Sequence, residues 1–322
     1  MKNKKAQQAA PNVKVMSRKK ERRLAVVRSQ LPYWVMLIIP ITFFLVIRYW
    51  PMYGLSIAFQ NYKIGDPFIS PDSRWAVTKW FKMLFKNPNF PRLVRNTLVL
   101  NSLSILISFP VAVGFALLLN EVRIRKFRNL TANISLLPYF ISTVVIVAIM
   151  YNVFSVDDGL VNMVIQKLGG EKINFLGSTD WFRPLYIGSD IWQNTGFNAV
   201  VFTAAIAGID PNLYEAAALD GSSRLKNIIY ITIPCILPTI IIMLLLRIGN
   251  IMTVGYEKII LMYTPSTYEV ADVLSTYAYR AGLDNQKYSL SAAISLINSV
   301  VNVILLVTAN KITKKLSDSS LW

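Results

Sequence analysis

The residue types that most often carry catalytic chemistry are scarce in this sequence. Its 322 residues include no histidine and one cysteine, Cys235. Without imidazole there is no histidine acid–base catalysis or metal binding, and a lone cysteine excludes an internal disulfide and a cysteine-clustered zinc site. The stretch Gly169-Gly170-Glu171-Lys172 does not fit the glycine-rich loop that cradles nucleotide phosphates. We therefore expect no ATP site, no hydrolytic site, and no cofactor or metal bound by this chain.

Polar residues inside apolar runs are the remaining candidates for a binding site. Such side chains are costly in hydrocarbon and mark functional positions by default, and amides, hydroxyls and aromatic faces suit a sugar. The alternative is that these polar side chains form hydrogen bonds between packed helices and do not bind a substrate. The pair Asp157-Asp158 could hold a metal, but the following Gly159 favours a turn. The candidates for a substrate cavity are Trp192, Gln193, Asn194, Asn198, Arg247 and Asn250.

The elements that must position these residues are helices that cross a membrane. Hydrophobic residues make up 54% of the chain and charged residues 16%, where a soluble domain has about 25% charged residues. The net charge is +17, but a nucleic-acid-binding domain would not be so apolar. We therefore expect an all-α, multi-pass membrane protein without a nucleic-acid partner.

Six apolar runs are candidates to cross about 30 Å of hydrocarbon as helices, which takes about 20 residues each. They do not alternate in the manner of membrane-barrel strands. No small-residue cleavage site follows the first run, so we interpret it as a retained span rather than a signal peptide. The expected spans are residues 31–47, 97–120, 130–156, 191–209, 228–256 and 288–310.

Lysine and arginine predict the orientation of these spans, because cytoplasmic loops carry an excess of both. Residues 1–30 hold ten of them and the short loop 121–129 holds four. We therefore expect both termini in the cytoplasm and the N-terminal block at the lipid headgroups. The outer segment 50–95 has a net charge of +5, which would attract an anionic solute or anchor an amphipathic helix over 80–86 at the membrane interface.

The segment after the fourth span has the signals of a short helix with defined ends. Asp210 suits the N-cap, where a carboxylate accepts hydrogen bonds from free backbone N–H groups, and Pro211 suits the first helical position. Residues 213–219 are good helix formers, and Gly221 suits the positive φ of a C-terminal cap. The local sequence supports both a lever that a partner grips and a plain connector.

The same segment resembles a known motif. Glu215-Ala216-Ala217-x-x-x-Gly221, followed by Ile233-Pro234, is similar to the EAA loop of permease subunits of binding-protein-dependent ABC importers, where leucine usually precedes the proline. The similarity runs over roughly residues 31–310. Gly255-Tyr256-Glu257-Lys258 and residues 268–273 resemble the oligosaccharide and polysaccharide branch, which includes lipoprotein-associated polysaccharide permeases and an alginate importer permease.

The resemblance implies the six-helix, maltose-permease-like fold of type I ABC importers. It implies a basic N-terminal segment over 1–30, a transmembrane domain over 31–310 with a coupling loop at 210–234, and a cytoplasmic tail over 311–322. The glutamate of the motif would contact the ATPase, the alanines would allow close packing, and the glycine would make the turn. The coupling residues implied are Glu215, Ala216, Ala217, Asp220, Gly221 and Pro234.

In such importers two permease subunits form the pore, two cytoplasmic ATPases grip one EAA helix each, and an extracytoplasmic solute-binding protein delivers the solute. The resemblance therefore implies a non-catalytic permease of the bacterial cytoplasmic membrane whose partner ATPases bind ATP and Mg. The implied substrate is an oligosaccharide or polysaccharide, and an acidic one such as alginate is a candidate. A secondary, ion-coupled transporter is the alternative and predicts related halves or a buried acidic relay; a membrane-embedded transferase would need a carboxylate cluster.

Glu215→Lys tests the role that the resemblance gives to this glutamate. Charge reversal at a contact with a partner should leave membrane insertion intact and abolish uptake by the transport complex. Uptake assays, with immunodetection of the inserted subunit as the control, measure both. Unchanged uptake would contradict the role.

Overall fold

The computed structural model describes residues 29–69, 74–253 and 255–316, and every regular element within these ranges is a helix. Of the predicted N-terminal segment 1–30, residues 1–28 lie outside the described ranges. Of the predicted tail 311–322, residues 317–322 lie outside them. The chain forms two units, Met1–Ser56 with Pro67–Ser70 and Ile57–Asp66 with Pro71–Trp322. Each is described by itself.

The first predicted span is confirmed as an apolar helix. It runs over Ser29–Phe59 and passes from α-helical turns into a π-helical turn, Leu45–Tyr49, and a 3-10 stretch, Trp50–Phe59. At 31 residues and about 1.5 Å per helical residue, this helix is long enough to cross about 30 Å of hydrocarbon.

Three helices of the second unit are also long and apolar enough to span a membrane, and they match the second, fifth and sixth predicted spans. The fifth ends at Ile248, short of the predicted residue 256, because Gly249 and Asn250 begin a turn. The elements of the three are α3 (Phe90–Leu103), a π-helical turn (Ser104–Ser108) and α4 (Phe109–Glu121); α10 (Arg224–Asn227), η5 (Ile228–Thr232) and α11 (Ile233–Ile248); and α15 (Tyr288–Leu316).

The third predicted span, residues 130–156, is not a single helix, which corrects the expectation. α5 (Arg125–Leu136) and its 3-10 extension to Phe140 meet α6 (Thr143–Phe154) at 100°. Pro138 in the extension has no backbone N–H to continue an α-helical ladder. Ser142 then starts α6 as its N-cap, with its hydroxyl accepting from the N–H of Val145.

The fourth predicted span, residues 191–209, lies in α8 (Thr179–Ala207), a helix of 29 residues. α8 is long enough to cross a membrane, but polar side chains such as Asp190 and Asn194 leave it outside the helices that pass as apolar spans. The described residues therefore hold four candidate spans, or five with the bent pair, and the count of six remains a prediction. The shorter helices are α2 (Lys79–Phe85), α7 (Leu160–Lys167), α9 (Pro211–Leu219), α12 (Tyr256–Met262), α13 (Tyr268–Ala271) and α14 (Leu274–Tyr279).

α8 packs against α4, α5 and α11 and is central to the second unit. Aromatic contacts lock it on two sides: Phe202 meets Phe109 of α4 edge to face at 5.7 Å, and Phe197 stacks on Tyr139 at 3.9 Å. Next to Phe197 the backbones of α8 and α5 approach so closely that a Cβ on Gly196 would lie 2.1 Å from the carbonyl oxygen of Ser135.

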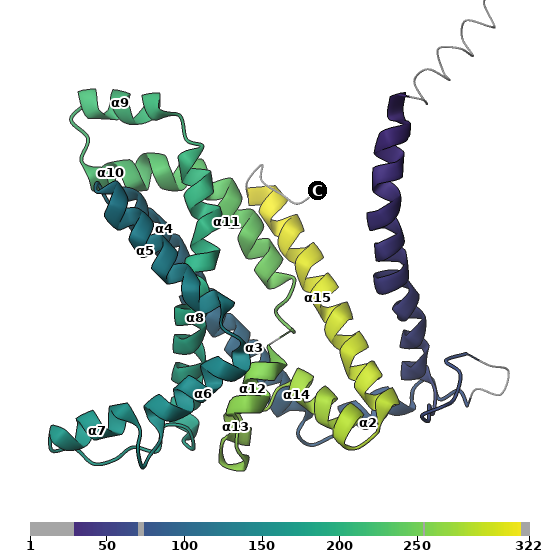
Figure 1. The fold of residues 1–322 in the computed structure, drawn as a ribbon. Coiled ribbons are helices and arrows are strands. Elements are labelled where there is room, and N and C mark those ends of the chain that lie inside the picture. The colour runs from purple at the N-terminus through teal and green to yellow at the C-terminus, as the bar shows by residue number, and fades with distance from the viewer. Residues whose placement is uncertain (1–28, 70–73, 254, 317–322) are drawn as a thin grey trace, which may run out of the picture. The chain divides into compact units, whose positions relative to one another are not determined.

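The connections of the second unit gather at its two ends (Figure 1). α9, the turn between α4 and α5, and the C-terminal end of α15 lie at one end, while α7 and α13 lie at the other. The basic loop 121–129 and the predicted coupling loop therefore share one end of this unit.

Asparagine side chains fix the irregular backbone between α11 and α15. Asn101 donates to the carbonyl of Ile251, and Asn302 accepts from the N–H of Met252 at 2.8 Å. Asn96 of α3 donates to two carbonyl groups at α13 and directly after it, at 2.9 and 3.0 Å. These bonds satisfy backbone groups that no helix pairs, which buried backbone requires.

Two glycines of α8 provide a matched test of the α5–α8 contact. Gly196→Ala should lower the thermal stability of the purified protein, because the new Cβ overlaps the Ser135 carbonyl. Gly188→Ala should be neutral or slightly stabilising, because a Cβ there meets no atom within 4 Å and alanine is the better helix former by about 1 kcal/mol. Thermal unfolding in detergent measures both, and equal melting temperatures for the two variants would contradict the packing.

Candidate functional site

α9 begins as the sequence predicts. The carboxylate of Asp210 accepts from the N–H of Asn212 at 3.0 Å, and Pro211 occupies the first turn. This cap satisfies one of the free N–H groups that every helix start exposes. The predicted N-terminal boundary is therefore confirmed.

Gly221 follows the C-cap residue of α9, and its φ of +71° is the left-handed conformation that favours glycine. The N–H of Ser222 donates to Ala217 O at 2.9 Å, and the N–H of Gly221 donates to Ala218 O at 3.1 Å. These two bonds form the Schellman arrangement that closes a helix C-terminus. Both ends of α9 are thus fixed by its own sequence, which makes a helix of nine residues a defined unit although helices this short are marginal in isolation.

A hydrogen bond ties α9 to the base of the long helix that follows. The hydroxyl oxygens of Tyr214 and Thr232 lie 2.9 Å apart. Thr232 is the last residue of η5 and is 1% exposed, and its hydroxyl also lies 3.3 Å from the carbonyl oxygen of Asn227. A displacement of α9 would therefore act directly on the start of α11.

The opposite side of α9 is open. No residue of α9 is buried within the described chain, Leu219 is 90% exposed, and Glu215 is exposed and forms no ion pair with a described residue. A single exposed leucine is ordinary, but a capped helix that combines exposed apolar side chains with a free carboxylate offers both kinds of contact that a protein partner uses.

Five of the six predicted coupling residues lie on α9 and its C-terminal turn, and the sixth lies at the start of α11. Glu215, Ala216 and Ala217 lie on α9, Asp220 is its C-cap residue and Gly221 makes the turn. Pro234 occupies the first turn of α11, next to Thr232. The structure thus places the predicted residues together, and their contact with an ATPase remains a prediction.

Two of the predicted cavity residues share a pocket. Arg247 and Asn250, at the end of α11 and just beyond it, line a pocket of about 320 Å³ together with Asn101 and Ser104. Arg247 is the one charged side chain among its lining residues. A pocket of this size with amide, hydroxyl and guanidinium groups suits a small polar, anionic group.

None of the four predicted cavity residues of α8 lines the Arg247 pocket. Trp192 lines a separate and mainly apolar pocket of about 440 Å³ with Trp181. Asn194 donates to the carboxylate of Asp190 at 2.7 Å. Gln193 and Asn198 line none of the four pockets described for this chain.

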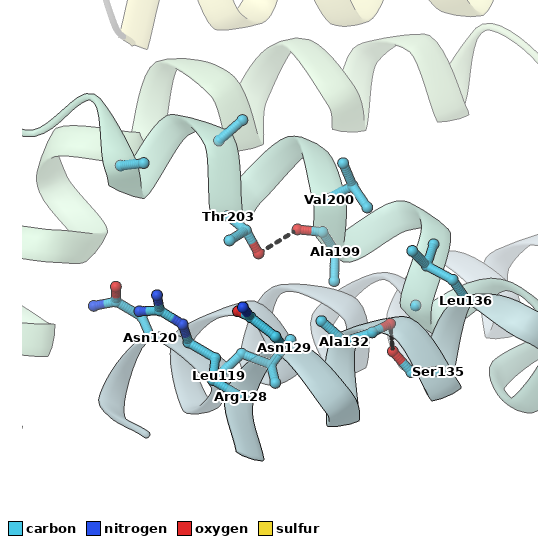
Figure 2. A pocket seen from close by; sticks show the side chains of 13 residues that line it. Leu119, Asn120, Arg128, Asn129, Ala132, Ser135, Leu136, Ala199, Val200 and Thr203 are labelled. Carbon is cyan, nitrogen blue, oxygen red and sulfur yellow. Dashed lines mark hydrogen bonds between the residues drawn. The ribbon is translucent and has the colours of Figure 1, made fainter. Parts of the chain in front are cut away.

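A third pocket, of about 440 Å³, lies between α4, α5 and α8 and contains none of the predicted residues. Figure 2 shows Asn120, Arg128 and Asn129 at one part of it and Leu136 at another. The hydroxyls of Thr203 and Ser135 bond to carbonyls of their own helices, at 2.8 Å each. The two hydroxyls of this pocket are therefore paired within their own helices, and the remaining polar side chains of its lining are Asn120, Arg128 and Asn129.

Sequence reasoning missed two ionisable residues. Asp190 lies inside α8 because this helix starts at Thr179, well before the predicted span, and Ser104 donates to its carboxylate at 3.2 Å. Lys258 is 7% exposed, and its Nζ has no hydrogen-bond partner among the described residues. Burial lowers the pKa of Lys258 to about 8, and the negative charge of Asp190 opposes part of that shift. Lys258 belongs to the Gly255-Tyr256-Glu257-Lys258 stretch, and this was the one sequence signal that could have pointed to it.

Comparison with known families decides the identity. A family described as "Binding-protein-dependent transport system inner membrane component" matches residues 102–318. The chain belongs to this family. It is therefore a permease subunit of this type, and the resemblance carried by Glu215-Ala216-Ala217 and its neighbours is confirmed.

Individual relatives agree with this assignment. The permease is 40% identical over 324 residues, the whole of both chains, to the polygalacturonan/rhamnogalacturonan transport system permease protein YteP of Bacillus subtilis (strain 168). It is 41% identical to protein LplB of the same organism over 90% of each chain. A crystal structure of a bacterial alginate ABC transporter in complex with an alginate pentasaccharide-bound periplasmic protein matches with a TM-score of 0.84 and 38% identity, over 92% of this chain and 99% of that chain.

The Tyr214–Thr232 hydrogen bond can be tested by a double-mutant cycle. Tyr214→Phe and Thr232→Val should each reduce substrate-stimulated ATP hydrolysis by the assembled complex, because α9 loses its attachment to α11. The double variant should lose little more than either single variant, since the hydrogen bond, worth about 1 kcal/mol, is removed once. Fully additive losses would show that the two residues act independently.

Proposed function

We propose that this permease forms half of the pore of an ATP-driven importer for an oligosaccharide or polysaccharide. The exposed, doubly capped α9 with its free Glu215 carries this proposal, because such a helix is suited to seat in a surface cleft of an ATPase. ATP-driven closure of two ATPase subunits would move α9, and the Tyr214–Thr232 bond would pass the movement to α11.

The other components follow from this arrangement. A second homologous permease subunit completes the pore, two cytoplasmic ATPases bind ATP and Mg, and an extracytoplasmic solute-binding protein delivers the saccharide. The sequence contains no glycine-rich loop of the kind that binds ATP. This suits a subunit whose partner ATPases hydrolyse the ATP. The membrane lipid contacts the apolar spans and the basic N-terminal segment.

The proposed topology has six spans in the bacterial cytoplasmic membrane, with both termini in the cytoplasm and the transmembrane domain over residues 31–310. The four apolar helices supply four spans, the bent α5–α6 pair a fifth and α8 the sixth. Grouping of the basic loop 121–129 with α9 at one end of the second unit supports a cytoplasmic position for both.

An acidic saccharide is the proposed substrate. The relatives named above include a polygalacturonan/rhamnogalacturonan permease and an alginate transporter, and uronate polymers share a carboxylate on each ring. Arg247 lines its pocket without a described acidic partner. On the outer segment, Lys79, Lys82 and Lys86 are exposed on and beside α2, while Leu84 is buried beneath them. Exposed positive charge would steer an anion toward the permease.

The function is tested on the complete importer reconstituted with its binding protein. Uronate oligosaccharides should stimulate ATP hydrolysis and uptake more than neutral oligosaccharides of the same length do. Arg247→Gln should reduce that difference by about tenfold, the value of one lost charge-assisted contact of about 1.5 kcal/mol. Uptake driven by an ion gradient without ATP would support a secondary transporter instead and overturn the proposal.

A further inference from the structure

A second polar pocket lies directly beside the Arg247 pocket. It has about 390 Å³ and is bounded by α14, α15 and the start of α12. Thr253 lines both pockets. None of the residues that line the second pocket carries a charge, and most of its polar lining consists of hydroxyl groups. Such a surface suits an uncharged, hydroxyl-rich ligand rather than an ion.

Two tyrosines form an aromatic wall of this pocket. The rings of Tyr256 and Tyr279 lie 5.8 Å apart between centroids and are nearly parallel, at 29°. Tyr256 is 48% exposed, so its ring is not used up in the core. A tyrosine ring offers an apolar face with a hydroxyl at its edge, which matches a pyranose ring with its apolar C–H face and hydroxyl rim.

The opposite wall is a row of serines on α15. Ser291, Ser295 and Ser299 all line the pocket, because residues four apart share one face of a helix. Ser299 donates its proton to the carbonyl of Ser295 at 2.9 Å, which leaves the lone pairs of its oxygen to accept. Ser295 and Ser299 are exposed within the described chain rather than packed against another of its helices.

An unsatisfied acceptor completes this wall. Asn298 lines the same pocket, and its Oδ1 is buried without a hydrogen-bond partner among the described residues. Buried carbonyl oxygens nearly always accept a hydrogen bond. The three α15 serine hydroxyls that line this volume favour a ligand with several hydroxyl groups.

The strip between the two pockets is held in place by one side chain of α15. Asn302 accepts from the N–H of Met252 at 2.8 Å and donates to Thr253 Oγ1 at 3.0 Å. The residue that lines both pockets is thus fixed by hydrogen bonds. Because Thr253 lines both pockets, the two volumes adjoin at a strip that is held by hydrogen bonds, which suits one extended ligand that occupies both.

We propose that the Tyr256–Tyr279 pocket is a second saccharide subsite, which stacks one sugar ring of an oligosaccharide while the Arg247 pocket binds a neighbouring part of the same chain. The inference rests on the proposed function. It divides recognition between the two pockets: the arginine selects for a carboxylate, and the tyrosines and serines recognise the ring and its hydroxyls whatever its charge. A substrate long enough to reach both pockets is then preferred over a short one.

The experiment measures the apparent KM for uptake of uronate oligosaccharides from disaccharide to pentasaccharide, with the complete reconstituted importer. Tyr279→Leu should raise the ratio of the pentasaccharide KM to the disaccharide KM about five- to tenfold, the value of one aromatic stacking contact. Tyr279→Phe, which keeps the ring, should restore most of the ratio. Thr308→Ala is the matched control, because Thr308 is an exposed α15 residue outside the pocket whose hydroxyl bonds to its own helix at 2.7 Å.

The outcomes separate the subsite from the proposed function. If the wild-type complex takes up no saccharide of any length, the proposed function fails. If it takes up saccharides and Tyr279→Leu changes all lengths equally or none, the second subsite is overturned. If Tyr279→Leu does not assemble, Ser295→Ala with Ser299→Ala gives the same test, and an unchanged length preference in that variant overturns the inference.

Discussion

Backbone hydrogen bonding in a hydrocarbon environment is the constraint on which the rest of this structure depends. A backbone donor or acceptor that has no water must be paired within the protein, so the spans are helices. Wherever a helix stops, other groups must replace the missing partners. Ser142 does so at the start of α6, and asparagines of α3 and α15 do so for the backbone between α11 and α12.

The proposed substrate pockets lie at one of these interruptions. The turn after α11 exposes Asn250 and Thr253, and the side chains that satisfy its backbone, Asn101 and Asn302, come from two other helices. The end of this span therefore supplies two things together: polar groups that can bind a hydroxyl-rich solute, and a residue, Thr253, that lines both pockets. A continuous apolar helix at this position would offer neither.

The proposed coupling helix depends on the same pairing of backbone groups, here achieved by its own caps. α9 is short, and it stays helical because its caps satisfy both of its ends locally. It needs little burial within this chain, which leaves Glu215 and Leu219 for a partner. The Tyr214–Thr232 bond joins it to the base of α11, and under the proposed function a movement of α9 would reach that helix, whose far end lines the Arg247 pocket.

The sequence by itself determined the features that depend on local chemistry. Apolar runs, the caps at Asp210 and Gly221, and the EAA pattern predicted most spans, α9 and the family, because hydropathy and capping act over a few neighbouring residues. The tertiary structure decided the rest: the break at Pro138 in the third predicted span, the extension of α8 that brings Asp190 inside it, the burial of Lys258 and the separation of Trp192 from Arg247. The burial of Lys258 and the separation of Trp192 from Arg247 arise from packing between helices far apart in the chain, which no local pattern encodes. The break at Pro138 and the early start of α8 have local causes, but the hydropathy of the two runs does not reveal them.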